Sequence, residues 1–178
     1  MHQVDRRVVV VGVLAAVVLL AAVTSVVPVE ARNWTVTVRV SRLMVKKAVD
    51  PWPADKHAEI YYYARIIAHA GGFIQWDKYE RTTSRTVEIG KTYDGGRFSF
   101  SNVPDTYRIS IRVEVWDDDN PIGMPYDDFL GGYPEGGANL RDAVWVWDVA
   151  YLEIFPGVST TFTIDNDKVF ARMELSWV

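Results

Sequence analysis

The sequence predicts an all-β fold for residues 32–178, an antiparallel sandwich of eight strands, and three observations support this. Short segments in which apolar and polar residues alternate recur along the chain. Turn-forming residues, mainly Gly, Pro, Asn and Asp, separate these segments. No segment after residue 31 has the pattern of a long helix. Many short strands joined by turns are typical of two packed antiparallel sheets.

The first strands follow from residue type and spacing. In 34–40, Trp and Val alternate with Thr and Arg, and 43–49 extends or follows this strand. Two prolines in 50–55 exclude a sheet interior, so that segment is a connecting loop. Aromatic and β-branched residues fill 59–68, which predicts the next strand.

The remaining strands are placed in the same way. They are expected at 73–76, 85–89, 97–101, 108–115, 160–164 and 169–178. The polar stretch 77–84 separates two of them, and the Gly-rich stretch 131–137 is expected to be a mobile loop. Residues 143–147 form only a short apolar run.

The N-terminal segment predicts a hydrophobic helix that targets the chain to a membrane. Residues 8–27 are almost continuously apolar and uncharged, and this length is enough to cross a bilayer. Arg6 and Arg7 precede it and would keep that side cytoplasmic. Small residues before position 32 also fit cleavage after Ala31, so a retained anchor and a cleaved signal peptide both remain open. We expect residues 32–178 to lie outside the cytoplasm, tethered or secreted.

Composition restricts the class of function. The 147 residues that follow Ala31 are enough for one domain with a sizeable core. The chain has no Cys, which excludes a disulfide framework and thiolate chemistry. A formal net charge of −4 argues against nucleic acid as a partner.

One loop carries the strongest chemical signal. Five aspartates follow the strand 108–115 before Gly131, with turn residues between them, and no Lys or Arg lies between Trp116 and Gly132. The five are Asp117, Asp118, Asp119, Asp127 and Asp128. A hard divalent cation would relieve their mutual repulsion, and Ca²⁺, which takes about six to eight oxygen ligands, suits them best. Without Cys, and with no His near this loop, zinc and copper are disfavoured.

The sequence of this loop resembles that of a C2 domain, a calcium-binding β-sandwich. The resemblance rests on Trp116-Asp-Asp-Asp119, followed later by Asp128-Phe-Leu-Gly131. It implies Asp117, Asp119 and Asp128 as calcium ligands, with Asp127 as an alternative to Asp128.

The resemblance also implies a second ligand loop, after the first strand. Asp50 fits its first ligand position, and Glu59 fits the second better than Asp55 does. C2 loops lie side by side at one end of the sandwich, so these acidic residues are expected to meet despite their separation in sequence.

The tips of the two loops carry apolar residues. These include Trp52 in the first loop and Ile122 and Met124 in the other. In lipid-docking C2 domains such tips enter the bilayer, so the resemblance implies a phospholipid surface as a partner. Scattered apolar surface residues are normal, and folding back over the loops is the alternative.

These observations predict a calcium-binding, C2-like domain that adheres to membrane lipid or to a surface partner. One alternative is a subunit of an extracellular filament or surface layer that donates the strand 34–40 to a neighbour. A second alternative is a carbohydrate-binding module, because seven Trp and nine Tyr offer flat rings for sugars. No catalytic motif is present, so we expect no enzymatic activity.

Overall fold

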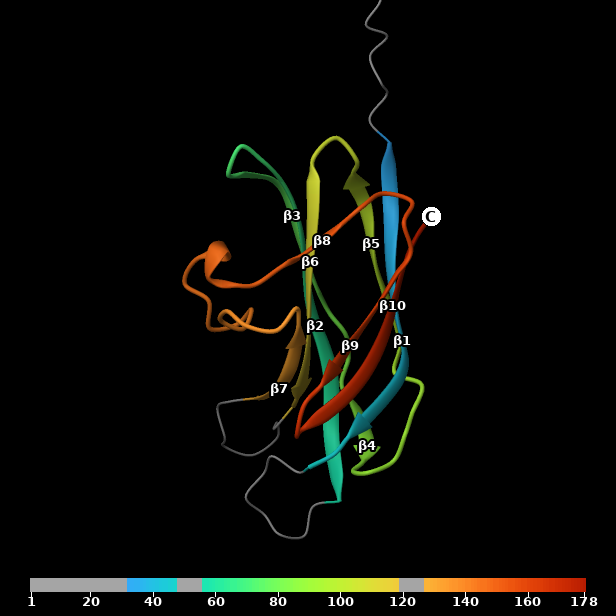
Figure 1. Ribbon diagram of the computed structural model, residues 1–178. Helices are drawn as coiled ribbons and strands as arrows, with labels where there is room; N and C mark the ends of the chain where they lie inside the picture. Colours follow the sequence, from blue (N-terminus) through green and yellow to red (C-terminus); the bar gives the residue numbers. More distant parts are fainter. Residues whose placement is uncertain (1–31, 48–55, 119–126) are drawn as a thin grey trace, which may run out of the picture. The chain divides into compact units, whose positions relative to one another are not determined.

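The computed structural model describes residues 32–47, 56–118 and 127–178, and these ranges form two antiparallel sheets (Figure 1). The strands are β1 (Asn33–Val45), β2 (His57–Ala70), β3 (Phe73–Arg81), β4 (Arg85–Glu88), β5 (Gly96–Pro104), β6 (Arg108–Asp117), β7 (Asp128–Tyr133), β8 (Leu152–Ile154), β9 (Thr160–Asp165) and β10 (Val169–Trp177). One short 3₁₀-helix, η1, spans Val146–Asp148. The prediction of an all-β antiparallel fold is confirmed for this part of the chain.

The two sheets differ in size. The four-stranded sheet has the order β5-β1-β10-β9, and the other has the order β3-β2-β6-β7. In the larger sheet β4 also pairs with β2, and β8 with β6, so each outer edge is shared by two strands. Every predicted strand is present. β7 and β8 were not predicted, so the described ranges contain ten strands where eight were expected.

Two segments that were predicted to be loops are partly strands in the structure. β3 continues through Asp77 to Arg81, where a polar connection was expected. The Gly-rich stretch that begins at Gly131 was expected to be a mobile loop, yet Gly131 and Gly132 belong to β7 and are buried. β3 is an edge strand without a fully buried residue. In β7, Gly131 and Gly132 lie so close to neighbouring side chains that there is no room for a larger residue. Neither segment therefore shows the usual alternation of apolar residues.

The main core lies between the sheets. Alternate residues of each strand enter it, as the period of two in a strand requires. In β2 these are the even-numbered residues from Ala58 to Ala68, and in β6 the odd-numbered residues from Ile109 to Val115. The odd-numbered residues of β2, including Tyr61 and Tyr63, therefore face outwards from the sandwich.

A second apolar layer covers the outer face of the larger sheet. Residues 134–151, which we call the outer strap, lie on this face beside β6 and β7 (Figure 1). Leu140 and Val149 of the strap are buried, as are Ile67 and Trp116 of the sheet, and none of these four belongs to the main core. Trp147 contacts His69 of β2 edge to face.

A buried ion pair fastens the strap to the sheet. Arg112 Nε donates to Glu114 Oε1 at 3.0 Å, and both side chains are almost fully buried. Arg112 also donates to the carbonyl oxygens of Pro134 and Gly136. Glu114 accepts hydrogen bonds from the backbone N–H of Leu140. The pair therefore holds the strap at its start, through Pro134 and Gly136, and again at Leu140.

The position of β1 bears on the filament alternative. β1 pairs with β5 on one side and with β10 on the other, so it is an interior strand of its sheet. Donation of 34–40 to a neighbouring molecule would break both ladders. The arrangement therefore does not favour strand donation.

Residues 1–31, with the predicted hydrophobic helix, lie outside the described residues. In the part of the chain that the structure describes, no helix is long and apolar enough to cross a membrane. Arg32–Val178 forms one compact unit.

Replacing Tyr62 with phenylalanine is expected to raise the free energy of unfolding by about 1 kcal/mol. The Tyr62 hydroxyl is buried and has no hydrogen-bond partner among the described residues, so its removal ends a desolvation cost. Tyr61→Phe, which deletes a hydrogen bond to Asp127, is the matched variant and should lower the same quantity. Urea unfolding followed by tryptophan fluorescence measures both. Equal changes in the two variants would contradict the prediction.

The same two variants should differ from the wild type in alkaline solution. Burial raises the pKa of Tyr62 and of Tyr61 above the ordinary value, so the unfolded chain releases these protons first as the pH rises above about 10. Each tyrosine therefore makes folding less favourable at high pH. Either substitution should weaken this alkaline loss of stability, which urea unfolding at neutral and at alkaline pH would detect.

Candidate functional site

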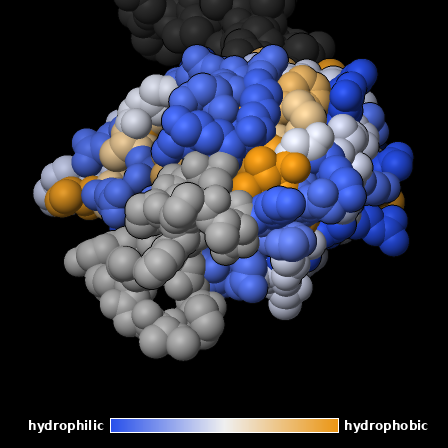
Figure 2. Space-filling model, turned by 90° about the horizontal axis from the view of Figure 1, so that it is seen from below, coloured by the Kyte–Doolittle hydropathy of each residue, from blue (hydrophilic) through white to orange (hydrophobic). Residues whose placement is uncertain are grey.

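The strand ends that flank the two predicted ligand loops lie at the same end of the sandwich. β1 ends at Val45 and β2 begins at His57, while β6 ends at Asp117 and β7 begins at Asp128. Ile60 is the register partner of Asp117, which brings the end of β6 beside the start of β2. Figure 2 looks onto this end and shows hydrophilic surface over much of the coloured area.

Asp117 and Asp128 are directly opposite each other across β6 and β7. Leu130 of β7 enters the main core, and by alternation Asp128 lies on the same inner side as Leu130. Asp117 also lies on this side, one residue beyond the outward-facing Trp116, and is only 4 % exposed. The structure thus brings these two predicted ligands together at the mouth between the sheets.

Glu59 joins this pair through its backbone. Its N–H donates to Asp117 Oδ1 at 2.7 Å, and its carbonyl oxygen accepts from the N–H of Asp118 at 2.7 Å. The Glu59 side chain is exposed and, by alternation in β2, lies on the outer side with Tyr61.

Asp118 is engaged by basic and hydroxyl groups from another part of the chain. Ser84 Oγ donates to Asp118 Oδ2, and Arg81 Nη2 lies 3.5 Å from the same oxygen. The loop lacks basic residues in sequence, but Arg81 reaches it in space through the pairing of β3 with β2.

Asp127 is held on the outer face. Its Oδ2 accepts from Tyr61 Oη at 2.8 Å and from Arg141 Nη1 at 2.6 Å, and Arg81 Nη2 lies 3.8 Å away. The adjacent Asp128 lies on the inner side, because neighbouring residues of an extended chain point in opposite directions. Of these two alternatives, only Asp128 therefore shares a side with Asp117.

Other predicted positions lie outside the described residues. They are the ligands Asp50 and Asp119, the alternative Asp55, and the apolar tips Trp52, Ile122 and Met124. Among the residues that are described, no group of three or more His, Asp or Glu side chains could hold a metal ion. Asp117 and Asp128 fit Ca²⁺ chemically, and the two loops would have to supply the remaining oxygen ligands.

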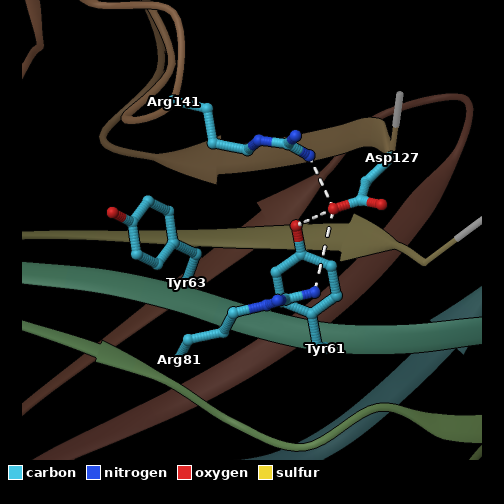
Figure 3. Close-up of a pocket in the computed structure, with 5 residues that line it drawn as sticks. All are labelled: Tyr61, Tyr63, Arg81, Asp127 and Arg141. Carbon is cyan, nitrogen blue, oxygen red and sulfur yellow. Dashed lines mark hydrogen bonds and ion pairs between the residues drawn. The ribbon is translucent and has the colours of Figure 1, made fainter. Parts of the chain in front are cut away.

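A pocket of about 240 Å³ opens on the outer face next to this end. It is lined by Tyr61 and Tyr63 of β2, Arg81 of β3, Asp127 and Arg141 of the outer strap (Figure 3). The two guanidinium groups approach the Asp127 carboxylate from opposite sides, and the Tyr61 hydroxyl points to the same oxygen.

Aromatic rings form the floor beneath these cations. Arg81 Cζ lies 4.1 Å from the ring centre of Tyr61, and Arg141 Cζ lies 5.1 Å from that of Trp116. The rings of Tyr61 and Trp116 are themselves stacked, with centres 6.4 Å apart and planes inclined by 13°. Burial, followed by the hydrogen bond to Asp127, raises the pKa of Tyr61, which keeps its hydroxyl a donor.

Of the residues of this pocket, only Asp127 was predicted as a site residue, and it was predicted as a calcium ligand. The sequence shows Tyr61 and Tyr63 on one strand face, but nothing in it links them to Arg81 or Arg141. Arg81 arrives through the β2–β3 ladder, and Arg141 arrives through the strap. These are long-range contacts without a local sequence signal.

No protein-family model matches the chain, and no curated protein sequence matches it. Solved structures give weak likenesses. A C2 domain of a plant extended synaptotagmin 1 has 16% identity and a TM-score of 0.44, with 80% of this chain and 92% of that one covered. A Drosophila C2-DSL-EGF1 structure has 8% identity and a TM-score of 0.44, with 81% and 67% covered.

Human GIVD cytosolic phospholipase A2, solved with methyl γ-linolenyl fluorophosphonate, has 15% identity and a TM-score of 0.43. The match covers 83% of this chain but only 17% of the phospholipase chain. Identity and structural overlap are low throughout, so these likenesses place no ligand or partner on this chain.

Proposed function

We propose that residues 32–178 form a C2-like, calcium-binding adhesion domain that acts outside the cytoplasm, tethered or secreted by residues 1–31. The observation that carries this proposal is the opposition of Asp117 and Asp128 at the end where both predicted ligand loops begin. Like charges directly opposite each other on neighbouring strands are destabilising. A divalent cation between them would turn this repulsion into attraction.

The ligand set would be completed by the two loops. Asp119 follows Asp117 by two residues, and Asp50 lies in the loop after β1. Loop carbonyl oxygens would supply further ligands, as Ca²⁺ coordination requires. Glu59 contributes through the backbone contacts that hold Asp117 in place. The role is binding, not catalysis, and the partner is membrane lipid or a surface molecule.

Calorimetric titration of the full chain with Ca²⁺ in mild detergent tests this proposal. Saturable binding is expected, together with a higher melting temperature in Ca²⁺ than in chelator. Asp117→Asn and Asp128→Asn should each lower the affinity at least about tenfold, because each removes a charged ligand. The side-chain oxygen of Asn still accepts the Glu59 N–H, so the fold should persist.

Glu153→Gln is the matched control. Glu153 is an exposed carboxylate of β8, which pairs with β6 at the end away from Asp117. Its substitution should leave the calcium affinity unchanged. A flat titration of the wild type would refute the proposed function, and so would wild-type affinity in both Asp variants.

A further inference from the structure

The pocket in Figure 3 is built around a carboxylate. Two arginines and one phenol converge on Asp127 Oδ2, which is the chemistry that recognises an acidic group. Arg81 stacks on the ring of Tyr61, and Arg141 stacks on that of Trp116. These contacts fix the positions of the two guanidinium groups before any ligand binds. A ligand would therefore meet donors whose positions are already fixed.

Asp127 contacts these donors through only one of its two carboxylate oxygens. All of its contacts with the pocket go to Oδ2, while its other carboxylate oxygen points away from both arginines (Figure 3). The 3.8 Å between Arg81 Nη2 and Oδ2 is an ion pair and is too long for a hydrogen bond. A carboxylate that entered from the open side could use both oxygens, one for each arginine.

The walls of the pocket favour a sugar as the carrier of that carboxylate. Tyr63 lines the pocket, and its ring stacks on that of Tyr79, 5.8 Å away, so that aromatic surface continues outward along the sheet. Tyr79 is 43% exposed. The exposed ring of Tyr79, beside the pocket, suits the apolar face of a neighbouring sugar in the same chain. A volume of about 240 Å³ is smaller than that of sites for drug-sized ligands.

We propose that Tyr61, Tyr63, Arg81 and Arg141 bind a uronic acid residue of an acidic polysaccharide, and that Asp127 occupies the arginines when this ligand is absent. The inference deepens the proposed adhesion by naming its partner class, and to that extent it rests on the proposed function. The pocket residues are nevertheless distinct from Asp117 and Asp128, so the two ideas can fail separately.

The test is titration of the full chain with trimers of galacturonic acid in the presence of chelator. The acidic trimer should bind, and the neutral galactose trimer should not bind at the same concentrations. Arg81→Gln and Arg141→Gln should each lower the affinity at least about tenfold, since each removes one charge-assisted contact. Arg42→Gln is the matched control, because Arg42 also stacks on a ring, that of Phe170, but in the other sheet.

Asp127→Asn gives the sharpest result. It removes the one carboxylate that contacts both arginines, while Asp118 still pairs with Arg81 alone. The affinity for the acidic trimer should therefore rise several-fold, whereas a purely structural role of Asp127 would give no gain. Thermal melts identify any variant that is not folded, and Tyr61→Phe then serves as a second variant with an expected loss of affinity.

Several outcomes would overturn the proposal. These are equal binding of both trimers, an unchanged or lower affinity in Asp127→Asn, and tighter binding of a poly-aspartate peptide or of inorganic phosphate than of the acidic trimer. Because chelator is present, a failed calcium titration leaves this result intact. Calcium binding without trimer binding would refute the pocket alone.

Discussion

Replacing Glu114 with alanine is expected to lower the free energy of unfolding by about 3–5 kcal/mol, because it leaves the buried Arg112 without its counter-charge. Glu114 is fully buried, and its carboxylate also accepts from the indole N–H of Trp116 at 3.0 Å and from the N–H of Leu140. All of these donors would lose their acceptor. Since domains are stable by only about 5–15 kcal/mol, the loss is a large part of the total.

Urea unfolding followed by tryptophan fluorescence measures this effect. Glu174→Ala is the control, because Glu174 forms an exposed, 4.0 Å pair with Arg39, and such pairs contribute at most about 1 kcal/mol. A Glu114→Ala variant that is as stable as Glu174→Ala would show that the buried pair does not hold the strap. Glu114→Ala should also lower the affinity of the pocket for the acidic trimer, because Arg141 belongs to the strap.

Glu114→Gln separates charge from hydrogen bonding. Burial raises the pKa of Glu114 above its ordinary value, although Arg112 opposes this. The contribution of this group to folding is therefore fully present below the ordinary pKa and declines as the pH rises through the raised folded value. The glutamine variant should lack this decline, which a comparison of unfolding free energies from acidic to neutral pH would detect.

The strands that could be predicted are those in which apolar and polar residues alternate in sequence. β6, β9 and β10 have this alternation, and the structure has them at the predicted places. In β6 the polar face is buried as well, which the sequence did not predict. The second half of β3 was missed because this edge strand has no fully buried residue, so its sequence carries no apolar period. β7 was missed because its two glycines are typical of loops.

The candidate site was predicted only in part, for a similar reason. The acidic loop and its place at a strand end can be read locally, and Asp117 and Asp128 do meet. The compensating cations cannot be read locally, because they depend on a strand ladder and on the outer strap. The absence of Lys and Arg near the aspartates in sequence therefore overstated their isolation in space.

Replacing Gly131 with valine is expected to lower the free energy of unfolding by at least about 1–3 kcal/mol, because β7 packs too closely against the opposite sheet to admit a side chain. A Cβ atom at Gly131 would lie 2.7 Å from Asn166 Nδ2 and 2.8 Å from Ile164 Cγ2. Asn166 Nδ2 donates to the carbonyl oxygen of Leu130 at 2.8 Å, so moving it aside breaks a contact between the sheets. The β9–β10 turn would then separate from β7.

The control for this variant is Thr161→Val, which places the same side chain at an exposed position of β9. It should be nearly neutral, since β-branched residues suit strands. Chemical unfolding of both variants measures the difference, and equal stabilities would mean that β7 can move away at little cost. Because β7 begins at Asp128, its displacement should also lower the calcium affinity of Gly131→Val, although this substitution removes no ligand. A stability loss without any change in calcium affinity would therefore place the ion-binding residues on a part of the chain that β7 does not position.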